Sequence, residues 1–341
     1  MPRAPVVCAQ VYVLDGPRGD PAPTPLCGWL LVKLVYSPRY TFDIGPHIFL
    51  TEKYRQVHER LTTHPHPDLV SVIEPRAATW DQLALVHSDE YLRKIRTLTL
   101  SSEELVQLEL PLTDEVVEGF RLMTGGTLTA ARVALGDGVC AHIGGGFHHA
   151  FADHGEGFCL FNDVAVALQT LRSEKAVSRV AVIDLDVHHG NGTALICDLD
   201  ASVFTFSMHD QHNYPVFKPR GSLDVRLPAG TGDQAYLAHL RQALPLVLAH
   251  QPDLVFYLAG ADPYEDDQLG HTKLTKDGLK QRDRLVLSAV HEAAVPTVIV
   301  LAGGYARQLI DTVDIHVSTV EAAMAISAAP TGPRRSFDRR W

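Results

Sequence analysis

Long apolar runs are missing from this sequence of 341 residues. No run reaches the roughly 18 apolar residues that a membrane-spanning helix needs, so we expect no membrane span. The N-terminal segment also lacks the apolar core of a secretion signal, because Pro and Gly interrupt it repeatedly. These two absences favour a soluble, cytoplasmic protein, or a nuclear one in a eukaryotic cell.

Cysteine is scarce and shows no CxxC spacing. The five cysteines are an odd number, and several of them stand in or beside apolar runs, so reduced, buried thiols are expected. Cys159 stands close to the candidate site described below, yet a structural thiol is favoured there over a catalytic one. The five residues are Cys8, Cys27, Cys140, Cys159 and Cys197.

Positive charge is in deficit as well, with 30 Lys and Arg against 40 Asp and Glu and a formal net charge of −10. Without an overall basic field, we expect no direct nucleic-acid binding. Histidine, by contrast, is plentiful: several of the 18 histidines cluster, which indicates metal or proton-transfer chemistry. His64 and His66 are exceptions, because their proline neighbours favour a surface turn.

The chain is predicted to form one folded domain over residues 32–329. Residues 1–31 are rich in Pro and Gly and show no periodicity, so we expect a disordered or loosely attached extension there. The basic tail at 330–341 is expected to be disordered too. We find no internal repeat.

Within the domain, near-continuous apolar runs alternate with helical patterns. This alternation predicts an α/β fold, a three-layer α/β/α arrangement around a central, mostly parallel sheet. Right-handed crossovers would place the functional loops at the carboxyl ends of the strands. The expected strands are 31–36, 71–74, 139–143, 180–185, 202–206, 254–259 and 297–301. The expected helices are 52–61, 79–86, the end of 87–95, 113–135 with its closely packing Gly125-Gly126, 163–171, 233–249, 276–294 and 317–328.

The segment DLDVHHGNG at 184–192 directly follows a buried strand. In an extended chain, alternate side chains share one face, so Asp184, Asp186 and His188 can lie on the same side. Two carboxylates and an imidazole at the end of a buried strand are costly unless a divalent cation compensates them. The simpler interpretation is a polar, capped loop between a strand and a helix.

Other polar residues follow the remaining strand ends. Three glycines precede His148 and His149, which could serve as general base and general acid. Asp262 follows the strand at 254–259, and Tyr305 follows Gly303-Gly304. Each residue alone has a structural explanation, but their joint occurrence at one edge of a parallel sheet predicts a site.

Asp186, His188 and Asp262 supply the oxygen and nitrogen ligands that zinc accepts. Three protein ligands with an open position are typical of a catalytic zinc. Asp184 is placed to accept a proton from an imidazole and fix its tautomer.

Five motifs in this order resemble the zinc-dependent histone deacetylase family. That family includes acetoin-utilisation proteins and acetylpolyamine amidohydrolases and has the arginase–deacetylase fold. The motifs are GGGFHHA (144–150), GEGFCLFND (155–163), DLDVHHGNG (184–192), GAD (260–262) and GGY (303–305). The segments YSPRY (36–40) and RLMTGGTLTAARVAL (121–135) are similar to the class IV branch and its bacterial relatives.

The resemblance implies a role for each matching residue. Asn191 matches a position that holds aspartate in class I enzymes, so His149 would be more weakly polarised here. The implied metal ligands are Asp186, His188 and Asp262, and the implied catalytic residues are His148, His149, Tyr305, Asp184 and Asn191. The implied substrate channel is Gly157, Phe158 and Tyr214, and a structural potassium site would use Asp184, Asp186, His188, Ser207 and Met208.

The function that this resemblance implies is hydrolysis of N-acyl amines by metal-activated water. The favoured substrate is N-ε-acyl-lysine, with acetyl or longer acyl groups, in a protein or peptide. The cofactor would be Zn²⁺, with Fe²⁺ as the alternative metal. An arginase-like dimanganese ureohydrolase is disfavoured, because the chain has neither a GGDHS loop nor a DAHxD run.

Two further hypotheses remain. An acetylpolyamine deacetylase would be favoured if Glu265, Asp266 and Asp267 made the pocket mouth acidic, although these residues could equally form a solvated loop. A catalytically silent protein that binds acyl-lysine is less consistent with the sequence, because a binder has no need of His148, His149 and Tyr305 together.

Overall fold

The structure is a computed structural model that describes residues 32–63 and 70–327. Cys8, Cys27, His64 and His66 lie outside the described residues, as do the predicted extension at 1–31 and the predicted tail at 330–341.

An eight-stranded sheet runs through the centre of the described chain, and every pairing in it is parallel. The strand order is β2-β1-β3-β8-β7-β4-β5-β6. The strands are β1 (Val32–Val35), β2 (Val70–Ile73), β3 (Val139–His142), β4 (Val180–Asp184), β5 (Val203–Asp210), β6 (Leu223–Leu227), β7 (Leu254–Leu258) and β8 (Thr297–Val300).

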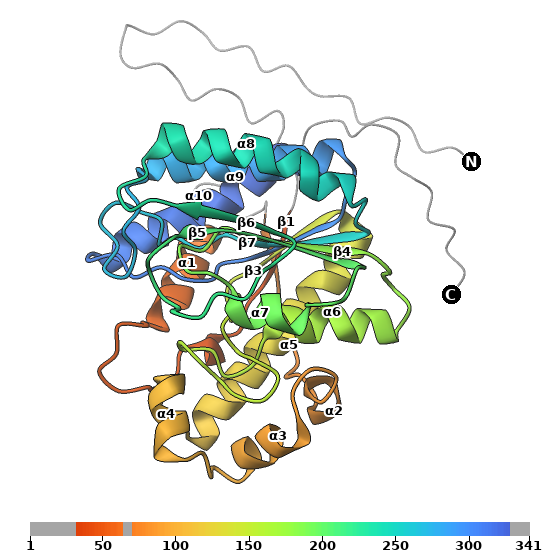
Figure 1. The fold of residues 1–341 in the computed structure, drawn as a ribbon, viewed down its shortest axis with the longest axis vertical. Coiled ribbons are helices and arrows are strands. Elements are labelled where there is room, and N and C mark those ends of the chain that lie inside the picture. The colour runs from red at the N-terminus through yellow and green to blue at the C-terminus, as the bar shows by residue number, and fades with distance from the viewer. Residues whose placement is uncertain (1–31, 64–69, 328–341) are drawn as a thin grey trace, which may run out of the picture.

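Helices cover both faces of this sheet, which makes the three layers that the sequence predicts (Figure 1). One face carries α1 (Glu52–Thr63), α8 (Asp233–Ala249), α9 (Lys276–Glu292) and α10 (Leu309–Ser327). The other carries α5 (Asp114–Asp137), α6 (Asp163–Ser173) and α7 (Asn191–Ile196). Three short helices lie beyond one end of α5: α2 (Trp80–Leu83), α3 (Asp89–Arg96) and α4 (Ser102–Leu108).

The apolar runs of the sequence follow from burial on both faces of the sheet. In β7, Leu254, Phe256 and Leu258 belong to the core that includes α5 and α6. The alternate residues Val255 and Tyr257 belong to the core beneath α8, α9 and α10. Because both sets are buried, the strand is apolar throughout.

The described chain differs from the prediction at several elements. The strand expected at 202–206 continues to Asp210, and the last helix begins at Leu309 rather than near 317. The short elements α4, α7 and β6 were not predicted. For α4 a signal existed, because Ser101 and Glu104 form a capping box.

No helix in residues 32–63 and 70–327 is both long and apolar enough to cross a membrane.

Candidate active site

The carboxyl ends of four neighbouring strands bring the candidate residues together. Strands β3, β8, β7 and β4 are adjacent in the sheet although they are far apart in the chain. His148 follows β3, His188 follows β4, Asp262 follows β7 and Tyr305 follows β8. The polar residues that follow these strands in the sequence therefore lie together at one edge of the sheet.

Asp186, His188 and Asp262 form a buried group whose ligand atoms all lie within 4.8 Å of one another. His188 Nδ1 lies 2.9 Å from Asp186 Oδ1 and 3.3 Å from Asp262 Oδ2. Asp262 Oδ2 has no hydrogen-bond partner. Burial and the neighbouring Asp186 carboxylate raise the pKa of Asp262 to about 7, although His188 opposes the shift. Two carboxylates and an imidazole around an unsatisfied oxygen fit a divalent cation such as zinc.

The Gly-Gly turn after β8 passes directly over these carboxylates. Gly303 N donates to Asp186 Oδ2 at 2.8 Å, and a Cβ at Gly303 would collide with Asp262 Oδ2. The glycine is needed there because the backbone must approach the ligands closely.

The two adjacent histidines have different partners and opposite pKa shifts. His148 Nδ1 lies 2.7 Å from Asp184 Oδ2, and its Nε2 lies 3.1 Å from Nε2 of His149. Burial opposes the charge on His148, but Asp184 and Asp186 outweigh it and raise the pKa to about 9. Burial and the charges of His148 and His188 hold the pKa of His149 well below 6.5. At neutral pH the pair therefore consists of one imidazolium and one neutral imidazole.

Asn191 orients the neutral histidine. Its Oδ1 lies 2.7 Å from His149 Nδ1, while its Nδ2 donates to Glu156 Oε1 at 2.7 Å. Because the Glu156 carboxylate only accepts, the Asn191 amide oxygen must face His149. The proton of His149 then lies on Nδ1, and its Nε2 carries no proton and lies 3.1 Å from Nε2 of His148. Glu156 was missed in the sequence, although it lies within the GEGFCLFND motif.

A buried network holds the loop that carries the histidine pair. The Asp163 carboxylate accepts from Gly146 N at 3.0 Å and from Phe147 N at 2.7 Å. Thr127 donates to the same carboxylate and contacts His142 Nδ1. The loop is thus fixed from α5 and α6, and sequence reasoning did not identify this support.

The substrate-channel residues predicted from the sequence flank the histidines. Gly157 has φ +51°, and a Cβ there would lie 2.9 Å from His149 Cδ2 and from the Tyr214 ring. The Tyr214 ring centroid lies 5.0 Å from that of His149. Phe158 has φ +66°, a left-handed conformation, and its N donates to Leu108 O at the end of α4.

Gly157 and Phe158, but not Tyr214, line a pocket with about 330 Å³ of empty space, part of which is open solvent. Its lining residues are Phe49, Tyr54, Gly145, Gly146, Phe147, His148, His149, Gly157, Phe158, Cys159, Asp186, His188, Ala302, Gly303 and Tyr305.

Tyr305 lies half-buried in this pocket with its ring 6.4 Å from that of His188. Burial and the charges of Asp186 and Asp262 raise its pKa well above 10, so the phenol stays protonated and can donate a hydrogen bond.

The Asp267 carboxylate fixes the backbone of Tyr305, accepting from its N at 2.7 Å. This corrects both expectations for Asp267, which is buried and lies neither at an acidic mouth nor in a solvated loop. Asp266 pairs with Arg307 at 3.3 Å, and Glu265 is exposed. None of the three lines the pocket.

Lys53 is a buried cation that sequence reasoning missed, because it lies in the ordinary helical pattern of α1. Its Nζ donates to Ala302 O at 3.1 Å and lies 5.4 Å from the centre of the Tyr305 ring. Burial lowers its pKa to about 8, although Asp262, Asp186 and Asp267 oppose that shift. It therefore adds positive charge behind the carboxylates.

The predicted potassium-site residues lie on β4, β5 and the loop after β4. Asp184 and Ser207 are register partners across the two strands, and Met208 follows Ser207. Ser207 Oγ also lies 2.9 Å from His209 Nδ1. The role of this group in cation binding stays a prediction.

The described cysteines agree with the expectation of reduced thiols, since Cys140, Cys159 and Cys197 are free and buried. Burial raises the pKa of Cys159 well above 9, which disfavours the thiolate and supports a structural role.

Comparisons with known proteins point to one family. A family model described as histone deacetylase domain matches residues 47–320. An uncharacterised protein of Picosynechococcus is 39% identical over 285 residues, covering 83% of this chain and 95% of that protein. Histone deacetylase 2 of Arabidopsis thaliana is 32% identical over 301 residues (83% and 78%), and the acetoin utilization protein AcuC of Bacillus subtilis is 31% identical over 296 residues (79% and 76%). The crystal structure of the HDA15 HD domain has the same fold, with a TM-score of 0.72 at 23% identity over 86% of this chain and 90% of that one.

Proposed function

The chain belongs to the histone deacetylase family, and from this premise we propose that it is a zinc-dependent hydrolase of N-ε-acyl-lysine. The observation that carries the proposal is the convergence of three features in one pocket. These are the Asp-His-Asp group, the pair of one charged and one neutral histidine, and the protonated phenol of Tyr305. A protein that only bound acyl-lysine would not need all three.

In this proposal Asp186, His188 and Asp262 hold the metal, with zinc favoured over ferrous iron. A bound zinc ion supplies Lewis-acid polarisation of the amide carbonyl and of water. Three protein ligands are the number that a catalytic zinc ion takes, and two of these residues, Asp186 and His188, line the pocket. The Lys53 charge behind the carboxylates and the Gly303 amide help to stabilise them.

The chain's own residues account for proton transfer. Neutral His149, with its Nδ1 proton held by Asn191, accepts the proton of the attacking water at Nε2. The same nitrogen then returns that proton to the departing amine. His148, charged through Asp184, stabilises negative charge beside it, and Tyr305 donates to the developing oxyanion.

The channel suits a long, narrow substrate arm. Phe158 and Tyr214 would flank the methylene chain of acyl-lysine, and Gly157 keeps the space beside His149 clear. An acetylpolyamine would also fit such a channel by shape. The charge at the mouth favours it less, because Asp267 is buried and Asp266 is paired with Arg307.

A panel of substrates tests the proposal. We expect the purified, zinc-loaded protein to deacylate acyl-lysine peptides and to lose this activity after chelation of the metal. Acetylated and long-chain acylated lysine peptides should be compared with acetylspermidine by kcat/KM. Turnover of acetylspermidine alone would move the function to polyamines, and no turnover of any substrate would contradict the proposal.

Two variants sharpen the panel. Asp262→Asn should lose the metal and the activity together, because the ion then has one carboxylate fewer. Glu265→Gln should leave acyl-lysine turnover unchanged, since Glu265 is exposed and outside the pocket lining. A selective loss with acetylspermidine in Glu265→Gln would instead support the polyamine alternative.

A further inference from the structure

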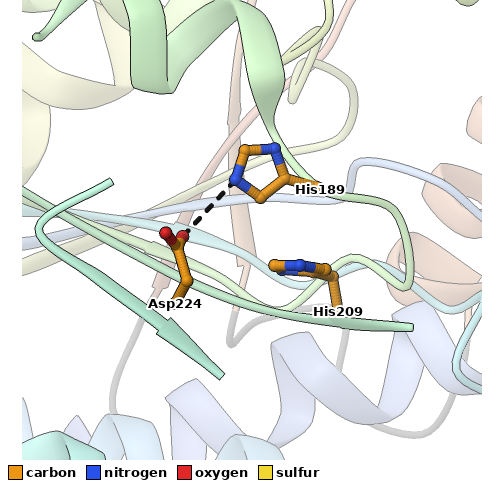
Figure 2. Close-up of side chains that lie close together, drawn as sticks. All are labelled: His189, His209 and Asp224. Atoms are coloured by element: carbon orange, nitrogen blue, oxygen red, sulfur yellow. Dashed lines mark ion pairs between the residues drawn. The ribbon is translucent and has the colours of Figure 1, made fainter. Parts of the chain in front are cut away.

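A second group of metal-type side chains lies outside the candidate active site. Among the described residues, His189, His209 and Asp224 form the other group whose ligand atoms all lie within 4.8 Å of one another. Figure 2 shows them converging from three elements: the loop after β4, strand β5 and strand β6. Nothing in the proposed hydrolysis uses these residues.

The polar atoms that face one another in this group have no hydrogen-bond partners. These atoms include His189 Nε2, His209 Nε2 and Asp224 Oδ1. The two histidines are each 1% exposed, so bulk solvent does not reach their ring nitrogens. Leaving a buried polar group unsatisfied is destabilising, and three such atoms around one point indicate that a ligand belongs between them.

In His209 and Asp224, the other polar atom of the side chain already has a hydrogen-bond partner. His209 Nδ1 lies 2.9 Å from Ser207 Oγ, and Asp224 Oδ2 accepts from Gly221 N at 2.9 Å. These contacts orient His209 Nε2 and Asp224 Oδ1 toward the centre of the group. Metal-binding histidines are typically held in this way, with one ring nitrogen hydrogen-bonded and the other on the metal.

An ion pair between His189 and Asp224, without a metal ion, would explain only part of this geometry. His189 Nε2 lies 3.4 Å from Asp224 Oδ1, the contact drawn as a dashed line in Figure 2. That pair would still leave His209 Nε2 without a partner, with its ring 4.6 Å from that of His189. One cation at the centre would satisfy both imidazoles and the carboxylate.

The positive charges nearby do not occupy the centre. Lys218 Nζ donates to the carbonyls of Asn213 and Pro215, and Arg226 is exposed. Solvent screens a charge at such positions more strongly than one inside the group. The Asp224 carboxylate is therefore available to offset the charge of a bound cation.

We propose that His189, His209 and Asp224 form a second metal site, which binds a zinc-type divalent cation through two imidazole nitrogens and one carboxylate oxygen. This ligand set suits zinc better than calcium or magnesium, which prefer oxygen ligands. The ion would tie the loop that carries His188 to β5 and to β6 at the edge of the sheet. The role is structural, and it does not depend on the proposed hydrolase activity.

Metal stoichiometry tests this proposal directly. The full-length protein is purified, exposed to Zn²⁺, dialysed, and measured for zinc per chain by elemental analysis. We expect about two ions in the natural protein and about one in His209→Gln or Asp224→Asn. His239→Gln, an exposed histidine on α8, is the matched control and should keep both ions.

Asp262→Asn separates this site from the active site. It should retain about one ion, and the double variant Asp262→Asn/His209→Gln should retain none. One ion in the natural protein that disappears in Asp262→Asn would overturn the second site. One ion that survives Asp262→Asn but disappears in His209→Gln would support the second site and contradict the first. Unchanged zinc content in both His209→Gln and Asp224→Asn would also overturn it.

Calorimetric titration covers the case in which the variants fail to fold. The natural protein is stripped with a chelator, checked by circular dichroism and titrated with Zn²⁺ in potassium buffer. Binding of two equivalents supports the proposal. Saturation at one equivalent overturns it where Asp262→Asn, titrated in the same way, binds none.

Discussion

Of two neighbouring histidines, one is charged and the other neutral because of what lies behind each ring. Asp184 holds a proton on His148, whereas Asn191 can only orient His149. The histidine in the less stabilising environment becomes the candidate base, because a neutral imidazole can accept a proton. When two titratable groups in an enzyme site have pKa values that lie far apart, the group with the low pKa can act as the base and the group with the high pKa as the acid or charge stabiliser.

This difference predicts a bell-shaped pH dependence of kcat/KM for an acetyl-lysine peptide. The base must be neutral, so activity is lost only as the pH falls through the pKa of His149, which lies well below 6.5. The charged partner must keep its proton, so activity declines as the pH rises through about 9, the pKa of His148.

Asn191→Asp tests the assignment of the two limbs. A carboxylate behind His149 raises the pKa of that histidine, so the acid limb should move to higher pH while the alkaline limb stays in place. Asp184→Asn should do the reverse, moving the alkaline limb to lower pH. An acid limb that does not respond to Asn191→Asp would contradict His149 as the base.

Tyr305→Phe removes one oxyanion donor without changing the metal ligands. We expect kcat to fall by about 10² to 10³ while the zinc content is unchanged. Tyr264→Phe is the matched control, because Tyr264 is only half-buried and lies outside the pocket lining. Full activity in Tyr305→Phe would remove the phenol from the proposed mechanism.

At the scale of single elements, α5 shows how a helix is adapted to the site loop. A Cβ at Gly126 would collide with Tyr40 Oη and His142 Nε2, which confirms the close packing expected for Gly125-Gly126. His142 in turn contacts Thr127, whose hydroxyl donates to Asp163. The packing of one helical glycine is thereby connected to the loop that bears the histidine pair.

Replacement of two glycines in α5 should have opposite effects on stability. Gly126→Ala should lower the free energy of unfolding by about 1–3 kcal/mol, because the added methyl group overpacks a buried contact. Gly136→Ala should raise it by up to about 1 kcal/mol, because open space surrounds that position and alanine favours the helix. Urea denaturation measures both, and equal effects would contradict the packing argument.

At the scale of the whole molecule, a buried charge pair connects the helix layer to the site. Arg282 and Asp283 of α9 are both buried. Arg282 donates to Gly260 O, just before Asp262, while Asp283 accepts from Tyr257 on β7 and from Thr319 on α10. The network therefore joins two helices to the strand that presents a predicted metal ligand.

Arg282→Met should cost about 3–5 kcal/mol of stability, because it leaves the buried Asp283 carboxylate without its cation. Arg284→Met is the matched control on the same helix, since Arg284 is exposed, and it should stay within about 0.5 kcal/mol of the natural protein. Chemical denaturation followed by circular dichroism gives both values. Equal stability of the two variants would contradict this role of the network.

The sequence by itself determined the fold class and the identity of most candidate residues. Strands buried on both faces are apolar throughout, so β4, β7 and β8 are visible as runs such as Val180–Asp184. Parallel strands present their carboxyl ends at one edge, so the polar residues that follow them could be predicted to meet. Short elements such as α4 and the half-buried edge strand β6 were missed, because their patterns are brief or mixed.

Only the tertiary structure decided the features that depend on distant neighbours. The different charge states of His148 and His149, the buried position of Asp267 and the burial of Lys53 all follow from contacts between separate segments. The group of His189, His209 and Asp224 likewise arises from three elements that the sheet order brings together. The local sequence pattern shows which segments are buried and where strands end. The pKa shifts and the sets of metal ligands depend instead on atoms from distant segments that lie close together in space.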